Sequence, residues 1–219
     1  ENTETNLTNA RELFASCIDR IFEHGSAQWT LSTLGDTCKF QGGSQPPKSE
    51  FRYEYDEGLV RLIQIRDYKS DKHLVYVPRH LARRFCEDDD VMIGRYGPPL
   101  FQILRGIVGA YNVALMKAVP DEQKIRKGFL YYFLKNRKIL QYIINASNRA
   151  AGQIGLNKAT LEPYPISYPS LHQQAEIEAK LDEAQKCCDA VEAATKTKLT
   201  DLEDLRQSLL QKAFAGELT

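Results

Sequence analysis

The segment Gln41–Gln45 carries side chains suited to reading DNA bases. It places two glutamines beside two glycines and a serine. Glutamine can form two parallel hydrogen bonds with the major-groove edge of adenine, and glycine lets a backbone approach a ligand closely. If the chain binds DNA, the candidates for base contacts in this segment are Gln41, Gly42, Gly43, Ser44 and Gln45.

A basic middle segment supplies candidates for phosphate or guanine contacts. Residues 31 to 150 hold 20 Lys and Arg against 13 Asp and Glu, a net charge of +7, whereas residues 1 to 30 carry −3 and residues 151 to 219 carry −4. This uneven charge indicates a polyanionic partner, although the whole chain is neutral. For each cation, a solvated surface charge is the alternative interpretation. The candidates are Arg66, Lys69, Lys72, Arg79, Arg83, Arg84, Arg95 and Arg105.

Several fragments resemble catalytic or metal sites but lack essential parts. GRYGPPLF at 94 to 101 has Gly97 where amino-methyltransferases have a polar residue, and no glycine-rich strand-to-helix turn for S-adenosylmethionine is present. The acidic run 87 to 90 lacks the second carboxylate and lysine cluster of a nuclease and predicts a solvated turn. His73 and His80 are expected to be surface or structural residues. We expect no catalytic residue, no metal site and no cofactor.

Composition places the chain among soluble globular proteins. It has 219 residues, 42% hydrophobic and 26% charged, and lacks both an apolar stretch of membrane-spanning length and the pattern of a signal peptide. The five cysteines form no C-x-x-C pair, so neither a disulfide framework nor a structural zinc is indicated. Cys187 and Cys188 are expected to be buried or half-buried. The sequence predicts a cytoplasmic protein without a membrane partner.

These candidate residues must be positioned by elements of three kinds. Residues 9 to 24 predict an amphipathic helix with Asn9 as its N-cap, ended by Gly25 and Ser26, which must pack on another element. From Trp29 to about Pro165, short apolar runs alternate with Gly, Pro and Asp, as in strands joined by turns, with Tyr53, Tyr55, Tyr96 and Tyr111 as packing residues. Residues 128 to 146 predict a single helix.

The last segment predicts one long projecting helix. Ser170 can cap it, with Gln173 as the reciprocal partner, and no Gly or Pro interrupts the chain from there to about Ala213. Apolar residues recur at alternating steps of three and four, so the helix, about 60 Å long, should pair with another helix. We expect it to lie antiparallel to the N-terminal helix and to leave part of its seam for a second chain. The predicted seam residues are Leu13, Phe14, Ile18, Ile177, Leu181, Val191, Leu202, Leu205 and Leu209.

The order of these features resembles the specificity subunit of type I restriction-modification systems. WTLSTLGDTCKFQGGSQP is similar to the opening of a target recognition domain, and GLVRLIQIRDY and CEDDDVMIGRYG are similar to its strand motifs. NRAAGQIGLNKATLEPYPISYPSLHQQAEIEAKLD resembles the exit of that domain into the family's long helix, and LRQSLLQKAFAGELT resembles that helix's end. TNLTNARELFASCIDRIF resembles the end of the family's central helix. The chain therefore resembles a C-terminal half, or a half-subunit that dimerises.

The resemblance implies an α+β fold: a globular mixed α/β target recognition domain with a long C-terminal helix in an antiparallel coiled coil. The implied division is residues 1–26, 27–168 and 169–219. It also implies a non-catalytic subunit that reads one half of a bipartite target in double-stranded DNA. The implied partners are modification (methyltransferase) subunits, a restriction subunit, and a second half-subunit or second copy. The alternative from the residues is a coiled-coil scaffold whose globular domain binds peptide.

Overall fold

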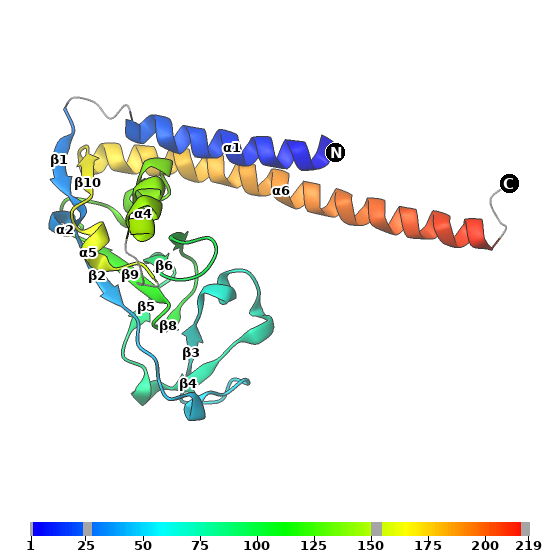
Figure 1. Cartoon of the computed structure of the whole chain (residues 1–219), viewed down its shortest axis with the longest axis horizontal. Helices are drawn as coiled ribbons and strands as arrows, with labels where there is room; N and C mark the ends of the chain where they lie inside the picture. Colours follow the sequence, from blue (N-terminus) through cyan, green and yellow to red (C-terminus); the bar gives the residue numbers. More distant parts are fainter. Residues whose placement is uncertain (1, 24–27, 150–154, 216–219) are drawn as a thin grey trace.

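A helix pair and a globular α+β domain make up the computed structural model, which describes residues 2–23, 28–149 and 155–215. The helix α1 (Asn2–Glu23) lies antiparallel along the first half of α6 (Leu171–Phe214), and the globular domain lies against one side of this pair (Figure 1). The last part of α6 projects beyond α1. This architecture confirms the predicted α+β class with a long projecting C-terminal helix.

Three small sheets build the globular domain. The strands β1 (Thr30–Thr33) and β10 (Pro165–Tyr168) pair antiparallel where the chain enters and leaves the domain. The second sheet is antiparallel, in the order β2 (Cys38–Gly42), β9 (Leu115–Pro120), β6 (Val91–Gly94), β7 (Gln102–Leu104). The third has the order β4 (Tyr76–Pro78), β3 (Leu59–Ile63), β8 (Gly109–Tyr111), β5 (Phe85–Cys86), with β3 and β8 parallel.

The third sheet and the turns around it, residues 46–86 and 106–111, form what we call the outer lobe. Its β4 end lies farthest from α1 and α6 (Figure 1). Much of its chain follows single helical turns rather than strands, which leaves many polar side chains exposed. These turns are η1 (Lys48–Glu50), η2 (Ile65–Tyr68), η3 (Asp71–His73) and η4 (Arg79–Leu81); α2 (Leu34–Thr37) and α5 (Lys158–Leu161) lie outside this lobe.

The largest core cluster joins the helices to the β2-β9-β6-β7 sheet. Ile93 from the sheet, Phe129 from α3 (Lys127–Leu134), Ile18 from α1 and Leu181 from α6 are all buried in it. Burying an apolar side chain of this size contributes about 1.5–3 kcal/mol. Because α1 and α6 share this core with the domain, the helix pair and the domain form one packed body.

Two helix predictions need correction. The segment 128–146 is not one helix but two, α3 (Lys127–Leu134) and α4 (Arg137–Arg149). Asn136 separates them because its side-chain oxygen accepts a hydrogen bond from the Lys138 N–H at 2.6 Å and so caps the second helix. The first helix begins at Asn2, so Asn9 lies inside it rather than at its N-cap. The predicted stop at Gly25 and Ser26 lies outside the described residues.

The start of α6 follows the prediction closely. The Ser170 hydroxyl accepts a hydrogen bond from the Gln173 N–H at 3.4 Å and donates one to the Gln173 side-chain oxygen at 3.1 Å. Ser170 is therefore the N-cap of α6. The Gln173 side chain is its reciprocal partner, because it accepts a hydrogen bond from the Ser170 hydroxyl. The helix ends at Phe214, one residue past the predicted end, and its 44 residues span about 66 Å.

Only some of the predicted seam residues are buried between α1 and α6. Leu181, Cys188 and Thr195 are buried on α6, and the Arg11 guanidinium pairs with Glu192 across the seam at 2.6 Å. Leu13 is 68% exposed, so the expectation that α6 packs on this residue is wrong within this chain. Beyond Thr195 the predicted seam residues Leu202, Leu205 and Leu209 are exposed, as is Val191.

Candidate nucleic-acid interface

The segment after β2 is held tightly against the chain's own backbone. The Gly43 N–H donates to the Leu115 carbonyl at 3.0 Å, and the Ser44 N–H donates to the Tyr111 carbonyl at 3.2 Å. A Cβ atom on Gly43 would lie 2.0 Å from the Asn112 carbonyl oxygen. Only glycine fits here, and the close approach that it allows is to residues 111 and 112 of the same chain.

A cavity of about 440 Å³ brings this segment next to residues far along the sequence. Its lining includes Ser44 and Gln45 from the predicted base-contacting segment and His80 and Arg83 from the turn after β4. The Gln45 side-chain N–H donates only to the neighbouring Pro46 carbonyl, at 3.4 Å. The structure therefore unites two of the predicted groups, and His80, expected to be a surface or structural residue, borders the same cavity.

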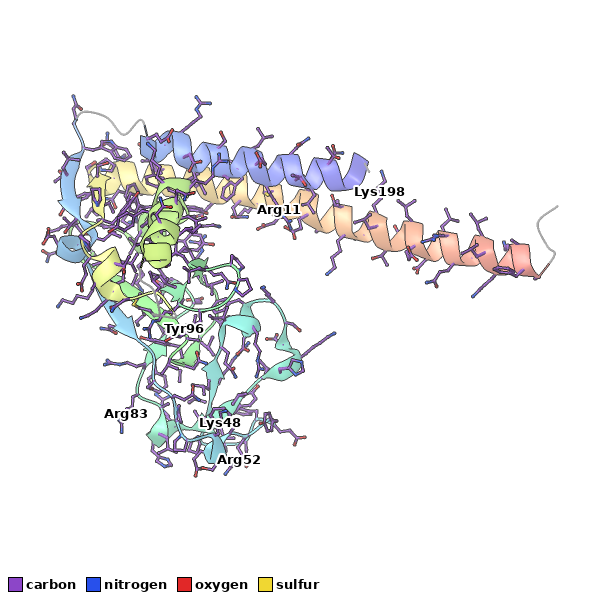
Figure 2. All side chains as sticks on the ribbon, viewed as in Figure 1. Arg11, Lys48, Arg52, Arg83, Tyr96 and Lys198 are labelled. Carbon is purple, nitrogen blue, oxygen red and sulfur yellow. The ribbon has the colours of Figure 1, made fainter. Side chains whose placement is uncertain are left out.

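Arg83 and Arg84 offer uncompensated positive charge beside this cavity. Both side chains are exposed, and no carboxylate of the described residues lies within ion-pairing distance of either. Arg79 stacks its guanidinium over the Phe85 ring at 5.0 Å. Figure 2 shows Arg83, Lys48 and Arg52 on the outer lobe, away from the helix pair. Such cations are the groups that a DNA phosphate needs.

Arg95 and Arg105 are engaged within the fold. The Arg95 side chain donates to the Leu156 carbonyl at 3.0 Å and to the Val113 carbonyl at 3.2 Å, which joins two loops next to Gly42. Arg105 donates to Asp182 on α6 at 2.9 Å and lies 4.1 Å from the centre of the Tyr131 ring. Direct DNA contact by Arg95 stays a prediction; its observed contacts hold the loops at Val113 and Leu156 together.

Arg66 and Lys69 lie in a different part of the outer lobe. The Arg66 side chain donates to the His73 carbonyl at 3.3 Å, and with Lys72 it lines a second hollow of about 440 Å³. Tyr53, Tyr55 and Tyr76 line the same hollow. The predicted cations thus divide into two groups on one lobe.

Two aromatic residues were misassigned from the sequence. Tyr53 and Tyr55 are 74% and 70% exposed rather than packed in a strand, whereas Tyr111 is fully buried as expected. Within the described residues, the segment 53–57 has no strand partner, because pairing stops at the bridge between Arg52 and Tyr76. The acidic residues alternating with these tyrosines were the available signal, since Glu54, Asp56 and Glu57 indicate a solvated segment.

Ion pairs engage several cations that lie between the second sheet and the helices. Asp90 accepts from Lys117 at 2.8 Å and pairs with Lys127 at 3.0 Å, so the expectation of a fully solvated acidic turn is wrong for this residue. Burial alone would raise the pKa of Asp90, but the hydrogen bonds from Lys117, the Glu87 N–H and Lys127 outweigh it and hold that pKa below its ordinary value. On the helix side, α1 and α6 pair with four more cations, namely Arg105, Arg126, Arg137 and Lys138.

The described residues contain no cluster of three or more His, Cys, Asp or Glu side chains that could hold a metal ion. None of the helices in the described ranges is long and apolar enough to span a membrane.

Known proteins match both the sequence and the fold. The family model described as the type I restriction modification DNA specificity domain matches residues 27–201. The type I restriction enzyme StySPI specificity subunit of Salmonella potsdam is 33% identical over 174 residues, which are 73% of this chain and 38% of that protein. The EcoBI specificity subunit of Escherichia coli is 28% identical over 175 residues, 74% of this chain and 35% of that protein.

Solved structures agree in fold. The HsdS subunit from Thermoanaerobacter tengcongensis is similar with a TM-score of 0.65 at 22% identity, covering 99% of this chain and 53% of that one. A chain from a type I restriction-modification complex is similar with a TM-score of 0.74 at 20% identity, covering 99% of this chain and 54% of that one. The chain spans less than two fifths of the length of the two curated relatives named above and about half of these structural neighbours.

Proposed function

The chain belongs to the family of type I restriction-modification DNA specificity domains, and from that premise we propose that its globular domain reads one half of a bipartite target in double-stranded DNA. In this proposal residues 27–168 are the recognition domain, and residues 1–26 and 169–219 are the helices that carry it. The scaffold alternative, with a peptide-binding domain, is not favoured, because the family match is to a DNA specificity domain.

One observation carries this proposal: the outer lobe exposes a group of cations without a counter-charge. Among the described residues, Lys48, Lys69, Lys72, Arg83 and Arg84 lie there without an ion pair. The helix α6 also carries unpaired lysines, but its acidic residues outnumber its basic residues by nine to six. Unpaired cations give phosphate affinity, and Gln45 beside Arg83 gives hydrogen-bonding groups for base edges. The outer lobe with the segment 41–45 is therefore our proposed DNA-contacting surface.

Binding to duplex DNA tests this function directly. The chain is titrated against a fluorescent random-sequence duplex and against duplexes selected from a random library, at 50 and 200 mM salt. A domain that contacts about five phosphates should lose roughly two to three orders of magnitude in affinity over this range. Binding without salt dependence would contradict the electrostatic part, and equal affinity for all duplexes, in the complete assembly, would contradict the specificity role.

We also propose that the chain is non-catalytic and places separate subunits on DNA. The described residues hold no metal cluster, and the sequence holds no complete methyltransferase motif. Modification (methyltransferase) subunits would supply methyl transfer, and a restriction subunit would join the larger complex, in the cytoplasm where chromosomal DNA is found. The purified chain with S-adenosylmethionine, ATP and magnesium should neither methylate nor cut DNA. Methyl incorporation by the chain alone would reject this assignment.

The projecting end of α6 is our proposed assembly surface. Leu199, Leu202, Leu205 and Leu209 recur at helical spacing there, and all four side chains are exposed. They continue the seam that α1 covers as far as Thr195, so a further antiparallel helix would complete a coiled coil. A second half-subunit or a second copy of this chain would supply that helix. The mass of the chain in solution, alone and with modification subunits, tests this arrangement.

A further inference from the structure

The hollow lined by Arg66 and Lys72 is distinct from the cavity beside Gln45. The two have similar volumes, about 440 Å³ each, and share no lining residue. Three tyrosines, Tyr53, Tyr55 and Tyr76, form one part of the lining of this hollow, and cationic side chains form another. Because aromatic faces and cations meet in this hollow, it has the groups needed to bind a ligand.

The tyrosines present aromatic surface that the fold does not use. Tyr53 and Tyr55 are largely exposed, and Tyr55 meets Tyr76 edge-on with ring centres 5.6 Å apart. Tyr53 and Tyr55 also line a neighbouring hollow of about 580 Å³, so they form a ridge between the two. Two exposed aromatic rings on one short segment leave apolar surface in contact with water. A planar group bound against the rings would cover that surface.

Hydrogen bonds within the outer lobe hold the cationic side of this hollow in place. The Arg66 side chain is anchored by its bond to the His73 carbonyl, and Arg61 donates to Asp71 at 2.9 Å on the same side of the hollow. Between them lies the Asp67 carboxylate, 1% exposed, 3.7 Å from the Arg61 guanidinium and 3.9 Å from that of Arg66.

This buried charge is incompletely compensated. The Asp67 Oδ1 and the Arg61 Nε are shut off from solvent and lack a hydrogen-bond partner among the described residues. Apart from its 3.9 Å contact with Asp67, the remaining guanidinium N–H groups of Arg66 have no hydrogen-bond partner in the described ranges. Lys72 is exposed and makes no ion pair there. Arg66 and Lys72 therefore keep donors available for an anion at the rim of the hollow.

We propose that this hollow binds an unstacked nucleobase, with the base against Tyr53 and Tyr55 and its phosphate on Arg66 and Lys72. Aromatic rings stack on any base because every base has a π-face, and nearby cations hold the backbone phosphate. The inference rests on the proposed DNA-binding function, in which an unpaired strand beside the bound duplex supplies the base. A free nucleotide offers the same chemistry, so the experiment separates the two sources.

The test compares three ligands on the full chain: a fluorescein-labelled single strand of ten nucleotides, a hairpin duplex that is closed by a non-nucleotide linker and so has no unpaired base, and deoxyadenosine monophosphate as competitor. The Tyr53→Ala/Tyr55→Ala variant should lose about tenfold or more in single-strand affinity and keep its hairpin affinity. Tyr53→Phe/Tyr55→Phe retains both rings and should retain binding. Phe214→Ala, which removes an aromatic side chain that is 89% exposed at the end of α6, is the matched control and should change nothing.

Two further readouts keep the test decisive. A 2-aminopurine base in the strand should be quenched on binding to the unaltered chain, which requires no variant. Lys72→Ala should lower the logarithmic salt slope for the single strand by about 0.7, the contribution of one phosphate contact. Competition by deoxyadenosine monophosphate below millimolar concentration identifies the free nucleotide as a ligand of the site; strand binding that resists it identifies the unpaired strand.

The inference is overturned if the unaltered chain binds the hairpin but not the single strand, or if the double alanine variant binds the single strand as well as the unaltered chain. Neither result would contradict the proposed function, because that function depends on hairpin binding. Absence of hairpin binding in the complete assembly would instead reject the proposed function. Quenching and single-strand affinity would then still report on the hollow by themselves.

Discussion

The side-chain oxygen of Gln174 accepts a hydrogen bond from the backbone N–H of Arg126 at 2.9 Å. The amide nitrogen of the same side chain donates to the Lys124 carbonyl at 2.8 Å and to the Pro169 carbonyl at 2.9 Å. Gln174 is fully buried, so it joins the first turn of α6 to the loop before α3 and to the end of β10. This side chain is thereby one of the links between the globular domain and the long helix.

Replacing this glutamine should destabilise the whole chain. Gln174→Ala would leave two carbonyl groups and one N–H group buried without partners, at a cost of about 1–3 kcal/mol for each group that water cannot reach. We expect the free energy of unfolding to fall by about 2–4 kcal/mol, measured by urea denaturation with Trp29 fluorescence. The control Gln207→Ala, at an exposed position on α6, should change it by less than about 0.5 kcal/mol. Equal stability of the two variants would show that the contacts of Gln174 are replaceable.

Asp90 should make stability depend on acid pH. Its folded-state pKa lies below the ordinary value of 3.8, so its carboxylate stabilises the fold above that value, and this contribution disappears as pH falls through the folded-state pKa. Asp90→Asn leaves the Lys117 ammonium without its anion and should cost about 3 kcal/mol at pH 7. The difference between variant and unaltered chain should shrink from pH 5 towards pH 3. Asp88→Asn, an exposed neighbour, is the control and should be neutral; a difference that stays constant with pH would contradict this account.

Arg83 and Arg84 should contribute to binding of every duplex. Reversing both charges by Arg83→Glu/Arg84→Glu should weaken binding about tenfold or more, independent of sequence, and lower the salt slope by nearly one unit for each phosphate that the variant no longer neutralises. Lys196→Glu/Lys198→Glu makes the same change in net charge on α6. Anisotropy titrations of the two variants separate a local interaction from a general charge effect, because only the first variant should bind weakly.

Gln41 and Gln45 should affect specificity rather than general affinity. Gln41→Ala/Gln45→Ala should cost about 1–3 kcal/mol on the preferred sequence and little on others if either glutamine contacts a base. The backbone carbonyl of Gln41 accepts from the Tyr111 hydroxyl at 3.3 Å, and the substitution leaves this hydrogen bond in place. A uniform loss of affinity over all sequences would assign the two glutamines to the backbone of DNA or to the loop's own shape.

Leu202 and Leu205 should be needed for assembly but not for folding. Both are half exposed, at 50% and 55%, so Leu202→Asp/Leu205→Asp should leave the thermal midpoint of the isolated chain within about 2 °C. The same variant should lose its partner helix, seen as a lower mass in solution and as failure to bind modification subunits. Gln207→Asp, on the opposite side of α6 and exposed, is the control. Unchanged assembly of the double variant would contradict the proposed seam.

The long helix was determined by the sequence alone, since its cap and its length are local properties. Ser170 bonds to a backbone N–H three residues away, and the stretch up to Ala213 contains no Gly or Pro that would interrupt it. The family was also evident from motifs in order along the chain, because those motifs are read without knowing any distance in space. By contrast, the break between α3 and α4 has a local part, the Asn136 cap, and a distant part, Asp19 of α1, which accepts from the Arg137 N–H at 3.0 Å.

In the candidate site too, some features follow from neighbouring residues in the sequence and others from residues distant along the chain. The sequence identified Gln45 and Arg83 separately, but only the folded chain places them on one cavity, because the segment after β2 is fixed to residues 111–115. Arg95 and Arg105 look like Arg83 in sequence, yet the first is bound to two loop carbonyls and the second to Asp182. Whether a cation is free or engaged depends on partners distant along the chain, and whether Tyr53 is buried depends on a neighbouring strand that is absent from the described residues. These are properties of tertiary packing, which local sequence patterns do not encode.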